Sequence, residues 1–142
     1  MEKLNVYLAD LVGAHAKLQN MHWNVVGEHF KMVHEYTETI YRQLYEYIDS
    51  VAEYMVMNGK RPFASLKDFA ENTTIAQLKS EEYKAGEVVR YSLAIVRALK
   101  ESAHEIHEET ECYLLQGLLE EQIASYSKHI WFLNSMIQPS HR

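Results

Sequence analysis

The chain has 142 residues, of which 47% are hydrophobic and 24% charged, and its formal net charge is −6. This length suits one domain with a proper core, and we treat residues 1–142 as that domain. No apolar run approaches the roughly 18 residues that a membrane helix needs, and the start of the chain has no signal-peptide pattern. A single cysteine, Cys112, fits a reducing compartment, so we expect a cytoplasmic protein without membrane association.

The negative net charge indicates which kinds of partner the protein can bind. General affinity for nucleic acid requires lysine and arginine to neutralise phosphates, so a net charge of −6 makes DNA binding unlikely. An acidic surface attracts cations and would raise their local concentration. The composition is therefore compatible with cation uptake.

Helix-forming residues dominate the sequence. Two prolines and five glycines stand against long stretches of Leu, Ala, Glu and Lys, which favours helices over strands. Apolar residues at helical spacing predict four long helices and a short one, over about 4–26, 28–58, 66–71, 81–108 and 111–136. We predict an all-α protein, a four-helix bundle whose short extra helix lies in the long crossover between the second and third long helices. Such a crossover allows those two helices to run parallel.

Local signals set the predicted helix ends. Gly27 ends the first helix, and Asn58-Gly59 followed by Pro62 ends the second. Ser65 starts the short helix as its N-cap. Ser80 is the predicted N-cap of the third long helix, with Glu81-Glu82 in a first turn whose dipole favours acidic residues.

The long helix over 28–58 carries two stripes. Its apolar stripe consists of Phe30, Val33, Ile40, Leu44, Ile48, Val51 and Met55. At about 100° per residue from His34, Glu38 lies at about 40°, Asp49 at about 60° and Glu53 at about 100°. A polar stripe that mixes imidazole and carboxylate therefore runs beside the core stripe. Spacing alone leaves open the alternative that this is an ordinary solvated face.

Distance divides the polar stripe into two half-sites. His34 and Asp49 are roughly 22 Å apart at a rise of about 1.5 Å per residue, so they cannot bind one ion within one chain. In a twofold antiparallel pair of helices, facing residues have numbers with a constant sum. The pair 34 and 53 and the pair 38 and 49 share the sum 87. Two copies packed antiparallel about a twofold axis near Gln43 and Leu44 would bring complementary half-sites together. We predict such a shared metal site, twice per dimer.

A further ligand is expected from the preceding helix, where His22 would fold back over the turn at Gly27. Mixed imidazole and carboxylate ligation suits iron, manganese or zinc better than calcium or a metal that prefers thiolates. Iron is the leading candidate. A change at Gln43 or Leu44 is expected to abolish metal binding together with assembly.

Four motifs carry a family resemblance: His22-Trp23-Asn24-Val25-Val26-Gly27-Glu28-His29-Phe30, Val33-His34-Glu35, Asp49-Ser50-Val51-Ala52-Glu53 and Gly59-Lys60-Arg61-Pro62. In order, identity and spacing they resemble the Dps family of ferritin-like miniferritins. The resemblance implies that His22, His34, Asp49 and Glu53 form a ferroxidase centre between twofold-related subunits. It places Glu38 at a position that is often acidic, and it implies that Trp23 intercepts oxidising equivalents near the iron.

The same resemblance implies an assembly and an activity. Fe(II) would be oxidised, with hydrogen peroxide preferred to dioxygen, and Fe(III) mineral would be stored inside a hollow dodecamer, which protects against oxidative stress. Two departures concern the surroundings of the site. Tyr54 stands where an arginine commonly follows the glutamate, and Glu108-Glu109-Thr110-Glu111-Cys112 replaces an Asp-rich segment that lines an iron entry pore in many relatives.

Two other functions stay open. A DNA-binding nucleoid protein would need a lysine-rich terminus, which this sequence does not show, and residues 138–142 are too short for a DNA-binding arm. A non-storing di-metal oxidase would hold its metals inside one chain. The Glu-x-x-His motif of such sites occurs once here, at Glu101 to His104, whereas they need it twice.

Overall fold

The computed structural model describes residues 1–139, and residues 140–142, part of the segment considered above as a DNA-binding arm, lie outside them. The elements are α1 (Glu2–Asn24), β1 (Val25–Val26), α2 (Phe30–Met57), α3 (Leu66–Asn72), β2 (Tyr83–Lys84), α4 (Ala85–Glu109) and α5 (Tyr113–Ile137). The predicted all-α class and the short crossover helix are confirmed. None of the helices within the described residues is long and apolar enough to span a bilayer.

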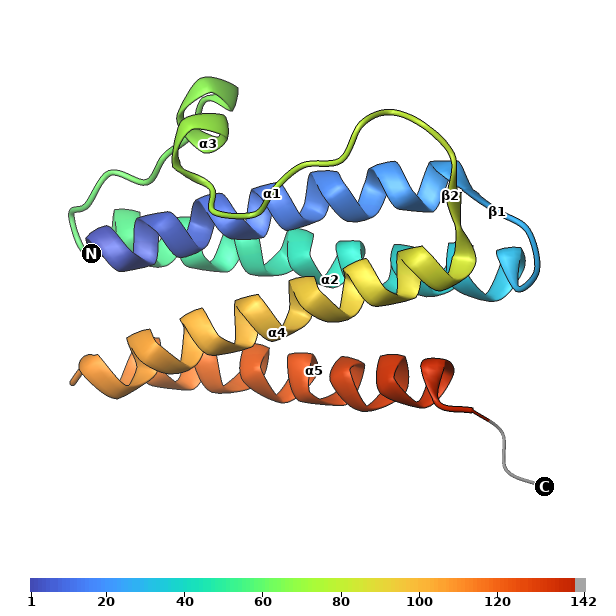
Figure 1. Cartoon of the computed structure of the whole chain (residues 1–142). Helices are drawn as coiled ribbons and strands as arrows, with labels where there is room; N and C mark the ends of the chain where they lie inside the picture. The colour runs from blue at the N-terminus through green and yellow to red at the C-terminus, as the bar shows by residue number, and fades with distance from the viewer. Residues whose placement is uncertain (140–142) are drawn as a thin grey trace.

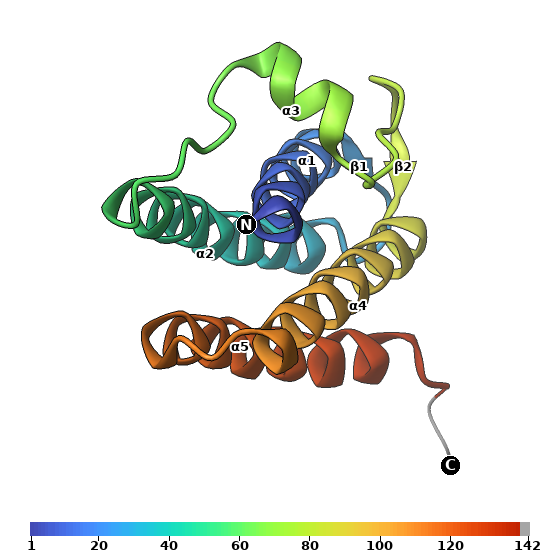
Figure 2. The same ribbon diagram turned by 90° about the vertical axis from the view of Figure 1, so that its left-hand side faces the viewer.

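The four long helices form two antiparallel pairs, α1 with α2 and α4 with α5 (Figure 1). The crossover from α2 to α4 runs along the length of the bundle, so α2 and α4 point in the same direction, as predicted. Helix α3 lies over α1 on the side away from α5 (Figure 2). This arrangement leaves one side of α2 uncovered by any other helix of the chain.

The apolar stripe of α2 faces the core. Val33, Ile40, Leu44, Val51 and Met55 are buried, and each large side chain of this kind stabilises the fold by about 1.5–3 kcal/mol relative to exposure. Phe30, at the start of the same stripe, is 43% exposed, because it lies at the open end of the bundle and stacks on His34 instead. The polar stripe therefore lies beside this core, on the outside of the bundle.

A buried carboxylate holds the crossover against α1. Asp10 is 3% exposed and accepts hydrogen bonds from the Thr73 hydroxyl (2.9 Å), the Thr74 amide (2.5 Å) and the Thr74 hydroxyl (2.8 Å). Gln77 donates to the Gly13 carbonyl over 2.9 Å. Without these partners the carboxylate would be costly to bury, so the sequence Thr73-Thr74 fixes where the crossover meets α1.

The predicted start of the third long helix was wrong. Helix α4 begins at Ala85 rather than after Ser80, because Tyr83 and Lys84 are extended and pair in parallel with Val25 and Val26. This two-residue ladder satisfies backbone groups that a helix would otherwise have used. It also joins the end of the crossover to the connection between α1 and α2, next to the candidate site.

Candidate metal centre

His22 and His34 are brought together by the connection between α1 and α2. His22 lies in the last turn of α1, and the chain reverses through Gly27 (φ 95°) and His29 (φ 67°) before α2 begins. Gly27 supplies its positive φ without steric cost. The two imidazole rings then stack with their centroids 3.8 Å apart and an interplanar angle of 12°. Residues that are twelve positions apart therefore form one unit.

The two histidines fix each other's tautomer. The Nδ1 atom of His22 donates to the His34 carbonyl over 2.5 Å, and the Nδ1 atom of His34 donates to the His22 carbonyl over 2.7 Å. A carbonyl only accepts, so both Nδ1 atoms carry hydrogen, and the lone pair of each neutral ring lies on Nε2. Metal-binding histidines are commonly held in this way, with the second ring nitrogen donating to a carbonyl.

A carboxylate lies next to this pair. Glu38 Oε1 is 3.6 Å from His22 Nε2, and Glu38 Oε2 forms an ion pair of 2.7 Å with Arg42 Nε. The hydroxyl of Thr37, which is buried, donates to the carbonyls of Val33 and His34. The roles of Arg42 and Thr37 were not predicted, although the four-residue spacing from Glu38 to Arg42 on one helix signals an ion pair.

Asp49 and Glu53 lie at the other end of α2. Both are exposed, and neither carboxylate makes a hydrogen bond or ion pair with the described residues. The helix is continuous from Phe30 to Met57, so Asp49 stays roughly 22 Å from His34 along the axis. Within residues 1–139 no three His, Cys, Asp or Glu side chains are placed to hold a metal ion together. One chain alone therefore presents two separate partial ligand sets.

The expectation for the middle of α2 needs correction. Leu44 is 1% exposed in the core of its own chain, and Gln43 accepts hydrogen bonds from Ser125 and His129 of α5. Leu44 is therefore unavailable for a contact with a second copy, and the amide oxygen of Gln43 is already used within its own chain. The exposed residues in the middle of the polar stripe are Arg42 and Tyr45, and Tyr45 is 64% exposed. Their residue numbers also add up to 87, the sum that relates the two half-sites.

The aromatic residues of α1 and α2 near His22 differ in their positions relative to it. The Tyr41 ring packs edge-on against His22 at 5.3 Å and against His15 at 5.2 Å. Trp23 is 66% exposed beside His22. Tyr36 points away, towards α5, where its ring contacts His129 and Phe132. Tyr36 therefore belongs to the interior of the bundle rather than to the polar stripe.

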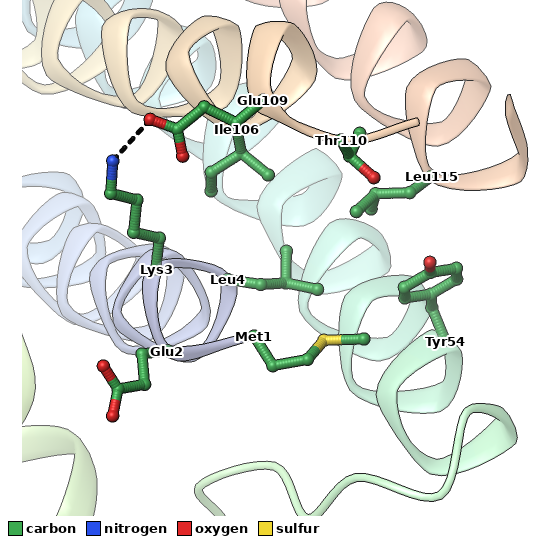
Figure 3. Close-up of a pocket in the computed structure, with 9 residues that line it drawn as sticks. All are labelled: Met1, Glu2, Lys3, Leu4, Tyr54, Ile106, Glu109, Thr110 and Leu115. Atoms are coloured by element: carbon green, nitrogen blue, oxygen red, sulfur yellow. Dashed lines mark hydrogen bonds and ion pairs between the residues drawn. The ribbon is translucent and has the colours of Figure 1, made fainter. Parts of the chain in front are cut away.

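The opposite end of the bundle holds a separate cavity of about 430 Å³. It lies between the start of α1 and the corner joining α4 to α5, and Tyr54 and Thr110 are among its lining residues (Figure 3). Lys3 closes one side through ion pairs of 2.7 Å with Glu105 and 2.6 Å with Glu109. Glu101 and His104, the residues of the single Glu-x-x-His, are exposed on the outside of α4. They do not face a bundle interior where a di-metal site would form.

Tyr54, which replaces the expected arginine, is buried beside Cys112. A hydrogen bond from the Tyr54 hydroxyl lowers the pKa of the Cys112 thiol, and backbone amides of Leu115 and Leu114 at the start of α5 lower it further. The same contact raises the pKa of Tyr54 to about 12. The two residues thus form a local pair between α2 and α5.

Comparison with known proteins identifies the structural class of this protein. The ferritin-like domain family matches residues 1–140. The structure of antigen TpF1 from Treponema pallidum superposes with a TM-score of 0.93 at 25% identity, covering 97% of this chain and 90% of that one. Dps from Listeria innocua, in crystals soaked with zinc, superposes with a TM-score of 0.90 at 26% identity, covering 96% and 94%. Bundle and crossover are therefore those of a ferritin-like protein.

Proteins of similar sequence identify the family within this class. The DNA protection during starvation protein of Brevibacillus brevis is 30% identical over 95% of this chain and 92% of its own length. DNA protection during starvation protein 2 of Bacillus anthracis is 31% identical over 96% and 95%. The chain belongs to the Dps family of ferritin-like proteins. At the level of the family, this membership supports a role in iron storage and protection.

Proposed function

We propose that the chain oxidises Fe(II) at a centre shared between two subunits and stores Fe(III) in a hollow homo-oligomer. The observation that supports this most directly is the reciprocal hydrogen bonding of His22 and His34, which leaves both Nε2 atoms with lone pairs. Two neutral nitrogen donors next to Glu38 form a partial site with a single carboxylate. The exposed Asp49 and Glu53 form a partial site that lacks nitrogen.

Twofold pairing of α2 completes both sites. In an antiparallel pair centred between Arg42 and Tyr45, His34 meets Glu53 of the partner subunit and Glu38 meets Asp49 of the partner subunit. A cation and an aromatic ring then face each other across the axis, a favourable combination. The uncovered side of α2 in the bundle is available for this contact (Figure 2).

The ligand set favours oxidation. His22 and His34 are neutral donors, while Asp49 and Glu53 bring negative charge that stabilises Fe(III) more than Fe(II). Iron is thus a substrate that arrives as Fe(II) and leaves as Fe(III) mineral. The same donor atoms also suit manganese and zinc. Hydrogen peroxide is the proposed oxidant, dioxygen the second choice, and Trp23 is proposed to intercept oxidising equivalents near the iron.

A dodecamer is the proposed assembly, with protection from peroxide as its physiological result. DNA binding stays a less favoured alternative, since the net charge is −6, and gel shift at low salt tests it. A di-metal oxidase with all ligands in one chain is not favoured by the exposed position of Glu101 and His104.

The decisive experiment is stopped-flow absorbance of Fe(II)-loaded protein, prepared without oxygen and mixed separately with peroxide or air-saturated buffer. We expect fast Fe(III) formation in the parent and loss of the fast phase in Asp49→Ala. Glu101→Ala is the matched control, because it removes an equally exposed carboxylate from the competing motif. An unchanged rate in Asp49→Ala, or a rate in the parent no faster than in buffer, would overturn the proposal.

A further inference from the structure

Tyr36 and His129 form a short hydrogen bond between α2 and α5 that the proposed ferroxidase centre does not use. Tyr36 Oη lies 2.6 Å from His129 Nδ1, and His129 Nε2 lies 2.6 Å from Gln43 Oε1. The Ser125 hydroxyl donates to the same Gln43 oxygen over 3.0 Å. His129 is 5% exposed, so this network lies inside the bundle.

The position of each proton in this network follows from the acceptor at its end. The amide oxygen of Gln43 only accepts, so Nε2 of His129 carries hydrogen. In the neutral ring the lone pair is then on Nδ1, and Tyr36 donates its phenol proton to it. Burial lowers the pKa of His129, and the positive charge of Lys128 lowers it further, so both favour the neutral ring.

The buried, hydrogen-bonded pair Tyr7 and Tyr126 lacks such a base. Tyr7 donates to Gln122 Oε1 over 2.6 Å and shares a 2.6 Å hydrogen bond with the Tyr126 hydroxyl. Neither acceptor is basic. Within residues 1–139, Tyr36 is the tyrosine whose hydroxyl is hydrogen-bonded to an imidazole nitrogen.

That difference matters for electron transfer. Removing one electron from a phenol makes its O–H group strongly acidic, so a tyrosine is oxidised readily only when a base can take the proton in the same step. A base at 2.6 Å is already within transfer distance. Tyr36 therefore has the arrangement of a redox-active tyrosine.

Its place in the chain connects it to the candidate centre. Tyr36 lies two residues after His34 on α2, about 3 Å further along the helix axis, and on the opposite side of the helix. We propose that Tyr36 supplies an electron to the oxidant at the metal centre, with His129 accepting its proton and Gln43 orienting His129. This inference rests on the proposed ferroxidase function.

The step balances when one Fe(II) occupies a site. Hydrogen peroxide takes one electron from Fe(II), which becomes Fe(III), and one from Tyr36. The O–O bond breaks, and two protons from solvent complete two waters. The phenol proton moves to His129 Nδ1, which leaves a neutral tyrosyl radical hydrogen-bonded to an imidazolium. A second Fe(II) then reduces the radical, and the proton returns to Tyr36.

A metal-free measurement tests the pair by itself. A ruthenium photosensitiser with a sacrificial electron acceptor is flashed in the presence of the full-length protein, and radicals are recorded by high-field electron paramagnetic resonance. We expect a tyrosyl component with the g-tensor of a phenoxyl oxygen that accepts a hydrogen bond. It should be absent in Tyr36→Phe and present in Tyr126→Phe, which makes the same chemical change at another buried hydrogen-bonded tyrosine. His129→Gln should slow its formation about 100-fold, as loss of a general base does.

A second measurement tests the coupling to iron. Protein with one Fe(II) per site is mixed with peroxide and freeze-quenched, with the tyrosines deuterated at the β-carbon to separate their signal from that of tryptophan. We expect the Tyr36 component in the parent and in Tyr126→Phe, and its loss in Tyr36→Phe. The signal should fall when two Fe(II) per site are supplied, because the second ion then provides the electron.

The outcomes separate the two proposals. Iron oxidation without a Tyr36 signal, or a signal that persists in Tyr36→Phe, would overturn the role of Tyr36 and leave the ferroxidase centre standing. A Tyr36 signal in the photochemical experiment together with no iron oxidation in the parent would overturn the ferroxidase proposal, and electron donation to the centre would fall with it. If Tyr36→Phe does not fold, His129→Gln decides by the same spectra.

Discussion

The two ends of α2 carry the two proposed half-sites, and the side chains of one are held in place by their own chain while those of the other are not. At the N-terminal end, His22 and His34 are stacked, hydrogen-bonded to each other's backbone and placed beside Glu38. At the C-terminal end, Asp49 and Glu53 are exposed and make no ion pair with the described residues. The nitrogen half is thus organised by its own chain. In the proposed dimer, the carboxylate half would be ordered by the metal and the nitrogens that a second subunit provides. We therefore expect changes at the two ends to behave differently.

The largest effect is expected from mixing two inactive variants. His34→Ala and Asp49→Ala should each lose fast iron oxidation by about 100-fold or more, because each lacks a direct ligand in every site. In a mixed dimer, the wild-type His34 of one subunit meets the wild-type carboxylates of the other, so one of the two sites is intact. Chains unfolded together and refolded should recover up to about a quarter of the parent activity, since half of the dimers are mixed.

The control for this experiment is a mixture of His34→Ala with His22→Ala. Both changes damage the nitrogen half, so no mixed dimer contains an intact site. Stopped-flow absorbance at equal total protein measures the parent, the three single variants and the two mixtures. Equal activity of the two mixtures would mean that the ligands are not divided between subunits.

The next largest effect is expected from a substitution at the proposed contact between subunits. Tyr45→Asp places a charge at the exposed centre of α2 and should shift the protein towards monomer, with loss of metal binding and no loss of helix content. Tyr45→Phe keeps the ring and should stay assembled. Leu44→Ala is expected to lower the free energy of unfolding by about 2–5 kcal/mol instead, because Leu44 lies in the core of its own chain. Light scattering and thermal unfolding by circular dichroism separate these results; an assembled Tyr45→Asp would place the contact elsewhere.

A smaller change tests how the nitrogen half is oriented. Thr37→Val removes the hydroxyl that donates to the Val33 and His34 carbonyls and lies 3.4 Å from His22 Nδ1. We expect metal affinity to fall by about 10-fold, the lower range for groups that orient ligands. Thr39→Val is the matched control, since the exposed Thr39 donates only to the Glu35 carbonyl on the same helix. Titration with Co(II) in the absence of oxygen measures both, and equal affinities would remove Thr37 from the description of the site.

Features that depend on residues close together in the sequence could be predicted, whereas features that depend on distant residues could not. The long helices and the crossover helix follow from local periodicity and caps, and the Ser65 hydroxyl does accept from the Asp68 amide over 3.1 Å. The start of α4 does not follow from such local signals. Tyr83 and Lys84 pair with Val25 and Val26, nearly sixty positions away, and this pairing competes with the local cap at Ser80. The resemblance implied that His22 and His34 belong to one centre. Their stacking and the mutual hydrogen bonds that fix their tautomers were not predicted, because they depend on backbone geometry at Gly27 and His29.

The error at Gln43 and Leu44 has a simple origin. A position along a helix axis says nothing about which side of the helix a residue occupies. At about 100° per residue, Gln43 and Leu44 lie at about 180° and 280° from His34, off the polar stripe, while Tyr45 lies at about 20°. The same arithmetic puts Tyr36 at about 200°, which is why it faces His129 rather than the metal centre.

The smallest effect is expected at Tyr54, which follows Glu53 directly but faces the other way. Its hydroxyl lowers the pKa of Cys112, so the thiolate is present at a lower pH than in a free cysteine and is lost only as the pH falls through this lowered pKa. Tyr54→Phe should therefore move the midpoint of Cys112 alkylation by iodoacetamide upwards, towards about 8.5. Tyr113→Phe, an exposed residue next to Cys112, is the control and should leave the midpoint unchanged. Iron oxidation should stay within about twofold of the parent, because a ligand and its immediate neighbour project from different sides of α2. A large loss of oxidation in Tyr54→Phe would show that Tyr54 takes over the part of the missing arginine, and that the carboxylate end is organised by its own chain as well.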